Sequence, residues 1–141
     1  MVAEHLQSKL NCDILRLEPQ TPYSDDYNSV VSQGQEEVNS GFTPKLQNLD
    51  VNLDDYDIVI LGSPIWWYTF SPVMRSFLTF NNLNDKKIYA FFTNGGYGLG
   101  HSLSDLNEFG LEVTDYLEVP FEGKEMQMSY QEIDDFASKI K

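Results

Sequence analysis

The strongest secondary-structure signal in the chain is the stretch DIVILG, from Asp57 to Gly62. Its four aliphatic residues follow one another without a polar residue between them, a pattern typical of a strand that is buried on both faces. Such strands occur in parallel sheets whose two faces are covered by helices. The stretch therefore predicts a central strand in an α/β protein.

Strand-like and helix-like patterns alternate on both sides of this stretch. Ser71 and Ser129 are the expected N-caps of two helices, and Ser102 with Asp105 resembles a capping box. The alternation predicts a parallel sheet of four strands with right-handed crossovers, in a single domain that spans residues 1–141. The predicted strands are residues 13–18, 57–62, 87–92 and 116–119, and the predicted helices are residues 2–10, 27–38, 71–78, 102–109 and 129–140.

The charge of the chain excludes several classes of partner. Its 141 residues include 22 acidic and 9 basic side chains, which gives a net charge of −13. A surface of this charge is repelled by phosphate backbones and by anionic lipids, so we expect no nucleic-acid partner and no membrane partner. No apolar run approaches the roughly 20 residues that a bilayer requires. The start of the sequence is unlike a secretory signal peptide, so we expect a cytoplasmic protein.

The cysteine and histidine residues predict no metal site. Cys12 is the only cysteine, so neither an intrachain disulfide nor a cysteine-based zinc site can form. His5 and His101 lie far apart in the sequence, with no spacing suited to a shared metal ion. No catalytic triad can be argued from the sequence. We therefore assign no metal ligand and no catalytic residue.

The loop after the strongest strand is the first part of a candidate ligand site, because ligands of parallel sheets bind outside the carboxyl ends of the strands. This loop, residues 63–71, contains both tryptophans of the protein, Trp66 and Trp67, beside two further aromatic rings. The rings form either a hydrophobic lid or a wall for a flat aromatic ligand. We expect the two indoles to line a pocket that faces the second loop, residues 93–101.

The second loop, TNGGYGLGH from Thr93 to His101, has four glycines in six positions. Glycine permits positive φ and a close approach of the backbone to a ligand, so backbone groups here could read the polar edge of a heterocycle. The alternative is a flexible turn without a ligand. His101, at the end of the loop, is either a proton donor or substrate contact, or the plain first residue of a helix.

Two segments together resemble the flavodoxin-like family, in particular its short bacterial members. The first is GSPIWW at residues 62–67 followed by PVMRSFL at residues 72–78, and the second is FTNGGYGLGHS at residues 92–102. PYSDDY at residues 22–27 and the pair Glu36-Glu37 are also similar to that subgroup. The resemblance implies a three-layer α/β sandwich with helices on both faces of a parallel sheet. In that family the sheet has five strands in the order 2-1-3-4-5, with FMN at the switch point.

The resemblance also implies that two sets of residues contact the flavin. The first set flanks the flavin ring, and the second touches the ring edge largely through backbone groups. The two sets are Ser63, Pro64, Ile65, Trp66 and Trp67, and Thr93, Asn94, Gly95, Gly96, Tyr97 and Gly98. FMN would supply the chemistry, and the protein would transfer electrons to an unknown redox partner or reduce a small acceptor.

The first strand and the phosphate-binding loop of the family have no counterpart in this chain, which is therefore N-terminally truncated relative to the family. Two alternative functions stay open: a cofactor-free interaction module, and an NAD(P)H-dependent quinone or azo reductase. The missing strand would leave residues 13–18 and 57–62 without their shared neighbour. Direct pairing of these two strands, or pairing or exchange between two chains, would satisfy their backbone groups, and we expect a homodimer.

Overall fold

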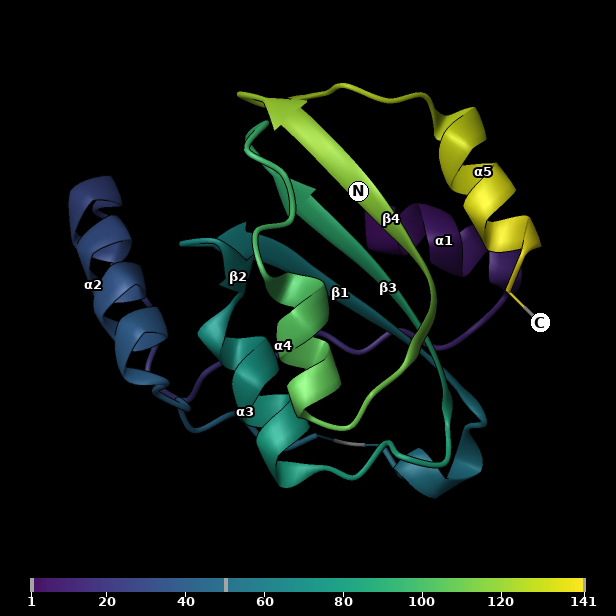
Figure 1. Cartoon of the computed structure of the whole chain (residues 1–141), viewed down its shortest axis with the longest axis horizontal. Helices are drawn as coiled ribbons and strands as arrows, with labels where there is room; N and C mark the ends of the chain where they lie inside the picture. Colours follow the sequence, from purple (N-terminus) through teal and green to yellow (C-terminus); the bar gives the residue numbers. More distant parts are fainter. Residues whose placement is uncertain (1, 50, 141) are drawn as a thin grey trace.

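Three parallel strands form the centre of the sheet in the computed structural model, which describes residues 2–49 and 51–140 (Figure 1). Strand β3 (Lys87–Asn94) lies between β1 (Ile58–Trp66) and β4 (Val113–Glu122) and pairs with both in parallel. Strands β3 and β4 contain the runs predicted at residues 87–92 and 116–119 and extend beyond them, and β1 begins one residue after the start of the run predicted at residues 57–62 and extends beyond its end. The predicted α/β class and parallel central sheet are confirmed.

The sheet has five strands rather than the four predicted, because two short antiparallel strands complete it. Strand β2 (Thr69–Phe70) pairs with the end of β1, and β5 (Glu125–Met126) pairs with the end of β4. Each arises where a long strand turns back on itself through a two-residue hairpin. The resulting order is β2-β1-β3-β4-β5.

The strand predicted at residues 13–18 is wrong. These residues run as mostly exposed chain, with Ile14 and Leu15 46% and 41% exposed, and they do not pair with β1. Next to them, Pro19 forms only an isolated antiparallel bridge with Leu46. A strand requires hydrogen bonds to a neighbour, which an apolar run cannot supply by itself.

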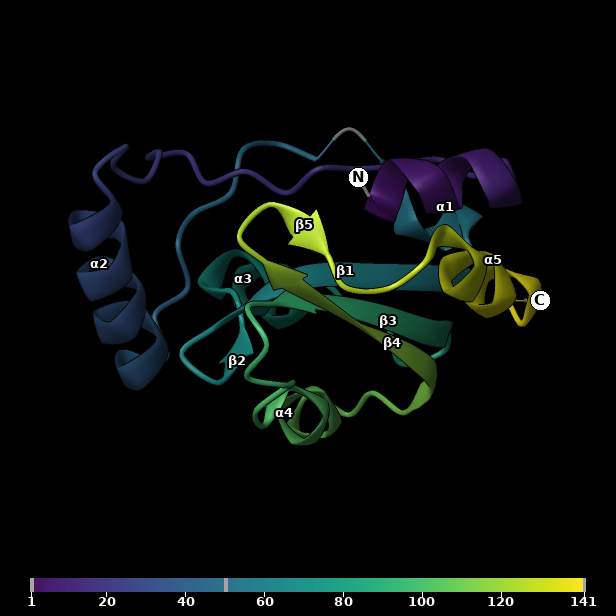
Figure 2. The same cartoon turned by 90° about the horizontal axis from the view of Figure 1, so that it is seen from above.

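Helices cover both faces of the sheet, so the predicted three layers are present (Figures 1 and 2). Helices α3 (Pro72–Phe80) and α4 (Ser102–Glu108) pack on one face, and α1 (Val2–Leu10) and α5 (Tyr130–Ser138) pack on the other. Helix α2 (Tyr27–Ser40) stands beside the β2 end of the sheet. Within the described ranges, no helix is long and apolar enough to cross a membrane.

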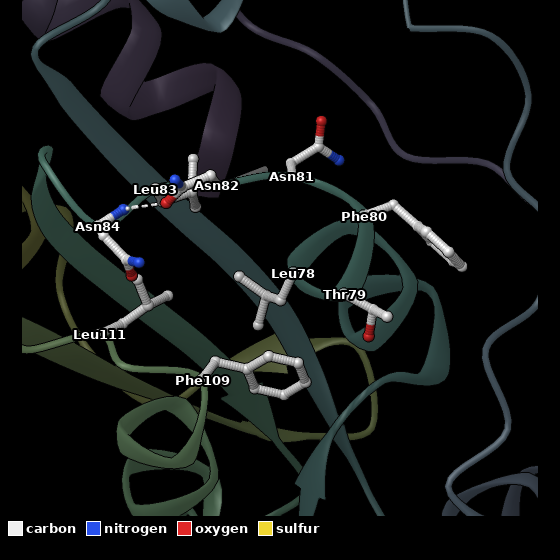
Figure 3. A pocket seen from close by; sticks show the side chains of 9 residues that line it. All are labelled: Leu78, Thr79, Phe80, Asn81, Asn82, Leu83, Asn84, Phe109 and Leu111. Carbon is white, nitrogen blue, oxygen red and sulfur yellow. Dashed lines mark hydrogen bonds between the residues drawn. The ribbon is translucent and has the colours of Figure 1, made fainter.

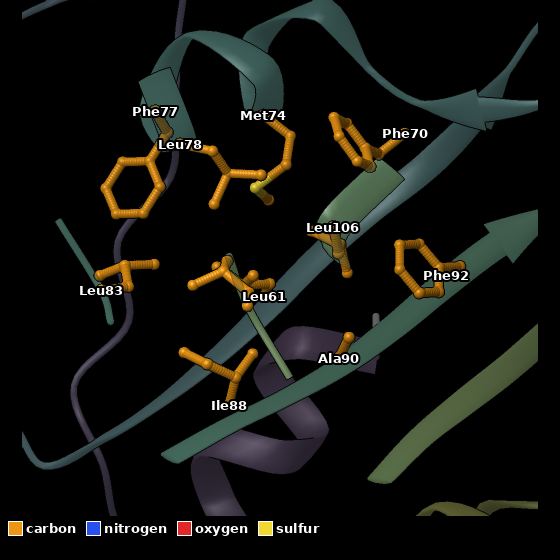
Figure 4. Close-up of a cluster of buried hydrophobic side chains, with 11 residues drawn as sticks. Leu61, Phe70, Met74, Phe77, Leu78, Leu83, Ile88, Ala90, Phe92 and Leu106 are labelled. Atoms are coloured by element: carbon orange, nitrogen blue, oxygen red, sulfur yellow. The ribbon is translucent and has the colours of Figure 1, made fainter. Parts of the chain in front are cut away.

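Each face of the sheet has its own hydrophobic core. The core beneath α3 and α4 is the larger, and Phe92 within it is 1% exposed (Figure 4). Strand β3 contributes to both cores because alternate side chains point to opposite faces. The first core consists of Leu61, Phe70, Met74, Phe77, Leu78, Leu83, Ile88, Ala90, Phe92, Leu106 and Leu111, and the second of Val2, Leu6, Tyr89, Val119, Ile133, Phe136 and Ala137.

Two of the three expected helix starts are confirmed. The Ser71 hydroxyl accepts a hydrogen bond from the backbone of α3, and Ser129 forms a full capping box with Glu132 at α5. The capping box expected from Ser102 and Asp105 is wrong. The N-cap residue of α4 is His101, one position before Ser102. The Asp105 carboxylate binds the side chains of Thr69 and His101 instead.

One edge of β1 carries free backbone groups. The Asp57 carbonyl accepts a hydrogen bond from the Lys87 N–H, so the odd-numbered residues of β1 face β3. Trp66 lies beside the two-residue turn and faces β2. The even-numbered residues between them face no strand in the described part of the chain. The N–H groups on this open edge belong to Ile58, Ile60 and Gly62.

Candidate functional site

The first candidate loop is a tight hairpin at the carboxyl end of β1. Trp67 and Tyr68 form its two-residue turn with φ values of 51° and 70°. Positive φ at both central positions is the geometry of a type I′ turn, whose twist matches that of the flanking strands. Residues 63–71 are expected from the sequence to form an irregular loop, but most of them belong to the end of β1, the turn and β2.

The second loop docks directly on this turn. The His101 N–H donates a hydrogen bond of 2.7 Å to the Tyr68 carbonyl oxygen. At Gly100, with φ of +57°, a Cβ atom would lie 2.0 Å from the same oxygen. Only glycine fits this contact, which brings the two predicted loops together at one edge of the sheet.

The glycine-rich segment of the second loop is held at its base and open at its tip. The Asn94 side chain accepts a hydrogen bond from the Gly96 N–H (2.7 Å) and donates one to Glu118 (3.2 Å). A Cβ atom at Gly95, Gly96 or Gly98 would meet nothing within 4 Å. The N–H groups at the tip meet no acceptor among the described residues, so they are available to a ligand; they belong to Tyr97, Gly98 and Leu99.

The two tryptophans face helix α2. The Trp67 Nε1–H donates a hydrogen bond of 3.0 Å to the Val31 carbonyl. Trp66 packs on Gly34, where a Cβ atom would lie 3.3 Å from the indole, and makes an edge contact with Tyr23. Gly34 lies within α2, and its lack of a side chain makes room for the indole. Both rings are half-buried, and their predicted contact with a flavin remains a prediction.

A hydrogen-bonded tyrosine–glutamate pair supports the contact between Tyr23 and Trp66. The Tyr23 hydroxyl donates a hydrogen bond of 2.8 Å to Glu37, which is 7% exposed. Burial, and then the hydrogen bond and charge of Glu37, raise the pKa of Tyr23 above its ordinary value, so the phenol stays a donor at neutral pH. The pair ties α2 to the loop that carries the ring against Trp66.

The remaining predicted residues differ in their burial and in their contacts. Ser63 is buried, and its hydroxyl accepts a hydrogen bond from the Ser71 N–H (3.0 Å) and donates one to the Pro64 carbonyl (2.8 Å). Its role in this structure is to join β1 to the start of α3. Pro64 is exposed at the sheet edge, while Ile65 and Thr93 are half-buried there.

A polar cluster beside these loops is not apparent from the sequence. Asp105 Oδ2 accepts a hydrogen bond from the Thr69 hydroxyl and lies 2.7 Å from His101 Nδ1. The Arg75 guanidinium is 4.0 Å from the same oxygen and lies over the Phe70 ring. The cluster joins β2, α3 and α4. The spacing of His101 and Asp105, four residues apart, was the one signal in the sequence that could have indicated it.

Two pockets of the described chain lie at the opposite edge of the sheet. The first, of about 360 Å³, is a groove between the end of α3 and the start of β3 (Figure 3). Its asparagines are partly occupied by hydrogen bonds, such as that from Asn81 to the Phe77 carbonyl. Its lining consists of Leu78, Thr79, Phe80, Asn81, Asn82, Leu83, Asn84, Phe109 and Leu111. No pair of titratable groups gathers in this groove, so the joined loops remain the candidate site.

The fold and the joined loops define an α/β protein with a ligand site at the carboxyl edge of its sheet. A family model described as Flavodoxin matches residues 1–134. The chain therefore belongs to the flavodoxin family, and the family predicted from the sequence is confirmed. No curated protein matches the sequence significantly.

Solved structures show the same fold. A candidate flavoprotein from Bacteroides eggerthii is 24% identical with a TM-score of 0.78, over 99% of this chain and 87% of its own. A second, from Bacteroides uniformis, is 19% identical with a TM-score of 0.81, over 98% and 88%. A flavoprotein from Lactobacillus acidophilus, crystallised in complex with FMN, is 19% identical with a TM-score of 0.63, over 82% and 84%.

Proposed function

We propose that this chain binds the ring of FMN at the joined loops and acts in electron transfer or in the reduction of a small acceptor. The observation that carries this proposal is the docking of the glycine-rich loop on the hairpin turn, through Gly100 and the Tyr68 carbonyl. It leaves an open surface lined by glycine and by free N–H groups at the carboxyl edge of the sheet. Membership of the flavodoxin family and the FMN complex of the Lactobacillus acidophilus protein support the choice of cofactor.

The residues present fit the ring of the cofactor. Gly95, Gly96 and Gly98 leave room for a planar group, and the N–H groups of Tyr97 and Gly98 can donate to its polar edge. Bound FMN would supply the one- and two-electron chemistry that side chains lack. The protein would orient the ring and exclude water from one of its edges.

The phosphate of FMN has no matching loop in the sequence, because no segment with the pattern Thr/Ser-x-Thr-Gly-x-Thr is present. We therefore predict weak binding of FMN by this chain and little preference over riboflavin, which lacks the phosphate. The two dissociation constants are expected to agree within about tenfold, or about 1.4 kcal/mol. Titration of each flavin with protein, followed by flavin fluorescence, measures both constants.

The same titration separates the proposal from its alternatives. Tight FMN binding with strong discrimination against riboflavin would contradict the prediction and require a phosphate site elsewhere in the chain. Failure to bind either flavin would favour a cofactor-free interaction module. The open edge of β1, with its free N–H groups at Ile58, Ile60 and Gly62, is the feature that favours this second candidate.

We also propose that the chain forms a homodimer. The open edge of β1 exposes backbone groups whose burial without partners costs about 1–3 kcal/mol each, so pairing with a second chain is favourable. The net charge of −13 opposes association, but salt at 0.1 M screens this repulsion beyond about 10 Å. We expect the mass measured by light scattering to be that of a dimer at moderate salt and to fall at low salt. A monomer mass at every protein and salt concentration would contradict the proposal.

A further inference from the structure

His101 is held in one orientation where the two loops meet. Its backbone N–H binds the Tyr68 carbonyl, and its ring Nδ1 lies 2.7 Å from Asp105 Oδ2. The side chain of His101 is 56% exposed, whereas that of Asp105 is only 13% exposed. With Nδ1 engaged by the carboxylate, Nε2 is the ring nitrogen that has no hydrogen-bond partner in the described part of the chain.

The surroundings of Asp105 keep it suited to orient this ring. The Thr69 hydroxyl donates to the same carboxylate oxygen, and Arg75 lies 4.0 Å from it. A carboxylate that accepts a hydrogen bond from Nδ1 favours the histidine form that carries a proton on that atom. Asp105 and Arg75 are the charged groups of α4 and α3 that face this ring through the cluster.

We propose that His101 is the proton donor for the two-electron reduction of a small carbonyl acceptor of the quinone class at this edge. This role rests on the proposed function. Reduction of a quinone to a hydroquinone takes one hydride, which bound reduced flavin would supply, and one proton. The doubly protonated ring of His101 gives its Nε2 proton to the oxygen of the acceptor, and the neutral imidazole that remains, with its proton on Nδ1, regains one from solvent. Thr69 and Asp105 are positioning residues.

If the imidazole had a purely structural role, its replacement would disturb the fold or the binding of flavin. The contact between the loops uses the backbone N–H of His101, which any residue at this position except proline retains. His101→Gln should therefore leave the fold and flavin affinity unchanged. His5→Gln is the matched control, because His5 lies at the junction of α1 and α5 and pairs with Asp134 there.

The test compares two acceptors for flavin that dithionite has reduced in the protein. Benzoquinone requires a proton, and ferricyanide takes single electrons without one. In His101→Gln, we expect reoxidation by benzoquinone to slow by about 10²-fold and to lose its decline with rising pH. Reoxidation by ferricyanide and riboflavin binding should be unchanged, and His5→Gln should behave as the wild type. Equal effects on both acceptors, or no effect on benzoquinone, would overturn the role of His101.

A second measurement needs no flavin. ¹⁵N NMR of the free protein should show His101 with its neutral proton fixed on Nδ1, and Asp105→Asn should abolish this preference while the fold persists. In the reduced protein, Asp105→Asn should slow reoxidation by benzoquinone but keep its pH dependence, since His101 is still present. A tautomer mixture in the wild type would contradict the orientation. Failure to bind any flavin would overturn the proposed function, and with it this role. A tautomer mixture alone would not overturn the proposed function.

Discussion

Gly100→Ala is expected to separate the two loops and to abolish measurable flavin binding. The new Cβ atom would lie 2.0 Å from the Tyr68 carbonyl oxygen, and the φ of +57° lies in the left-handed region. That conformation alone costs about 1–2 kcal/mol for alanine, and relief of the clash moves backbone rather than a flexible side chain. We expect the free energy of unfolding to fall by about 2–4 kcal/mol, measured by urea denaturation, and the fluorescence titration to show no binding.

Gly95→Ala is the matched control for this variant. Gly95 lies in the same loop, but its φ is not in the left-handed region and its Cβ atom would meet nothing within 4 Å. The same substitution should therefore change the stability by less than about 1 kcal/mol. Equal losses of stability in the two variants would show that Gly100 does not make the contact described.

Phe92→Ala is expected to remove much of the stability of the domain. Phe92 is a member of the core beneath α3 and α4 and is 1% exposed. Truncation of a buried phenylalanine costs about 3–5 kcal/mol, and domains of this size are stable by only about 5–15 kcal/mol. Urea denaturation followed by circular dichroism measures the loss.

Phe80→Ala supplies the comparison, since Phe80 is the same residue type at the end of α3 and is 73% exposed. We expect a change within about 0.5 kcal/mol for this exposed position. Similar losses for both phenylalanines would mean that β3 does not lie at the centre of the sheet.

The central strands could be predicted because their sequences carry the information locally. An unbroken aliphatic run identifies β1, and the run from Lys87 to Phe92 identifies β3. The continuation of β1 into Pro64 could not be predicted, because proline usually ends a strand. In the structure the even-numbered residues of β1, such as Ile60, Gly62 and Pro64, direct their backbone groups to the open edge. The lack of an N–H at Pro64 therefore removes no hydrogen bond to β3.

The error at residues 13–18 has a different cause. Their short apolar run, which ends at Pro19, is typical of a strand, but a strand forms only where a neighbour supplies hydrogen bonds. The periodicity of a sequence indicates which face of a strand can be buried, but it does not identify the neighbouring strand. Leu17 accordingly keeps a partial contact with the core, while Ile14 and Leu15 stay exposed.

The location of the site could be predicted, but the contacts that build it could not. Both loops follow strong strands, and parallel strands place such loops at one edge. The contact between Gly100 and Tyr68, and that between Thr69 and Asp105, join residues more than thirty positions apart. Ser102 and Asp105 also resemble a capping box, whereas in the structure Asp105 binds His101, the N-cap residue of α4.

The central claim is that the flavin ring binds at the joined loops, and the most direct measurement is the change in backbone amide NMR shifts when riboflavin is added to ¹⁵N-labelled protein. We predict that the largest changes occur at Gly95, Gly96, Tyr97 and Gly98, because the glycines leave open space beside the free N–H groups of Tyr97 and Gly98. Largest changes at the groove around residues 78–84, or no changes at saturating riboflavin, would contradict the claim.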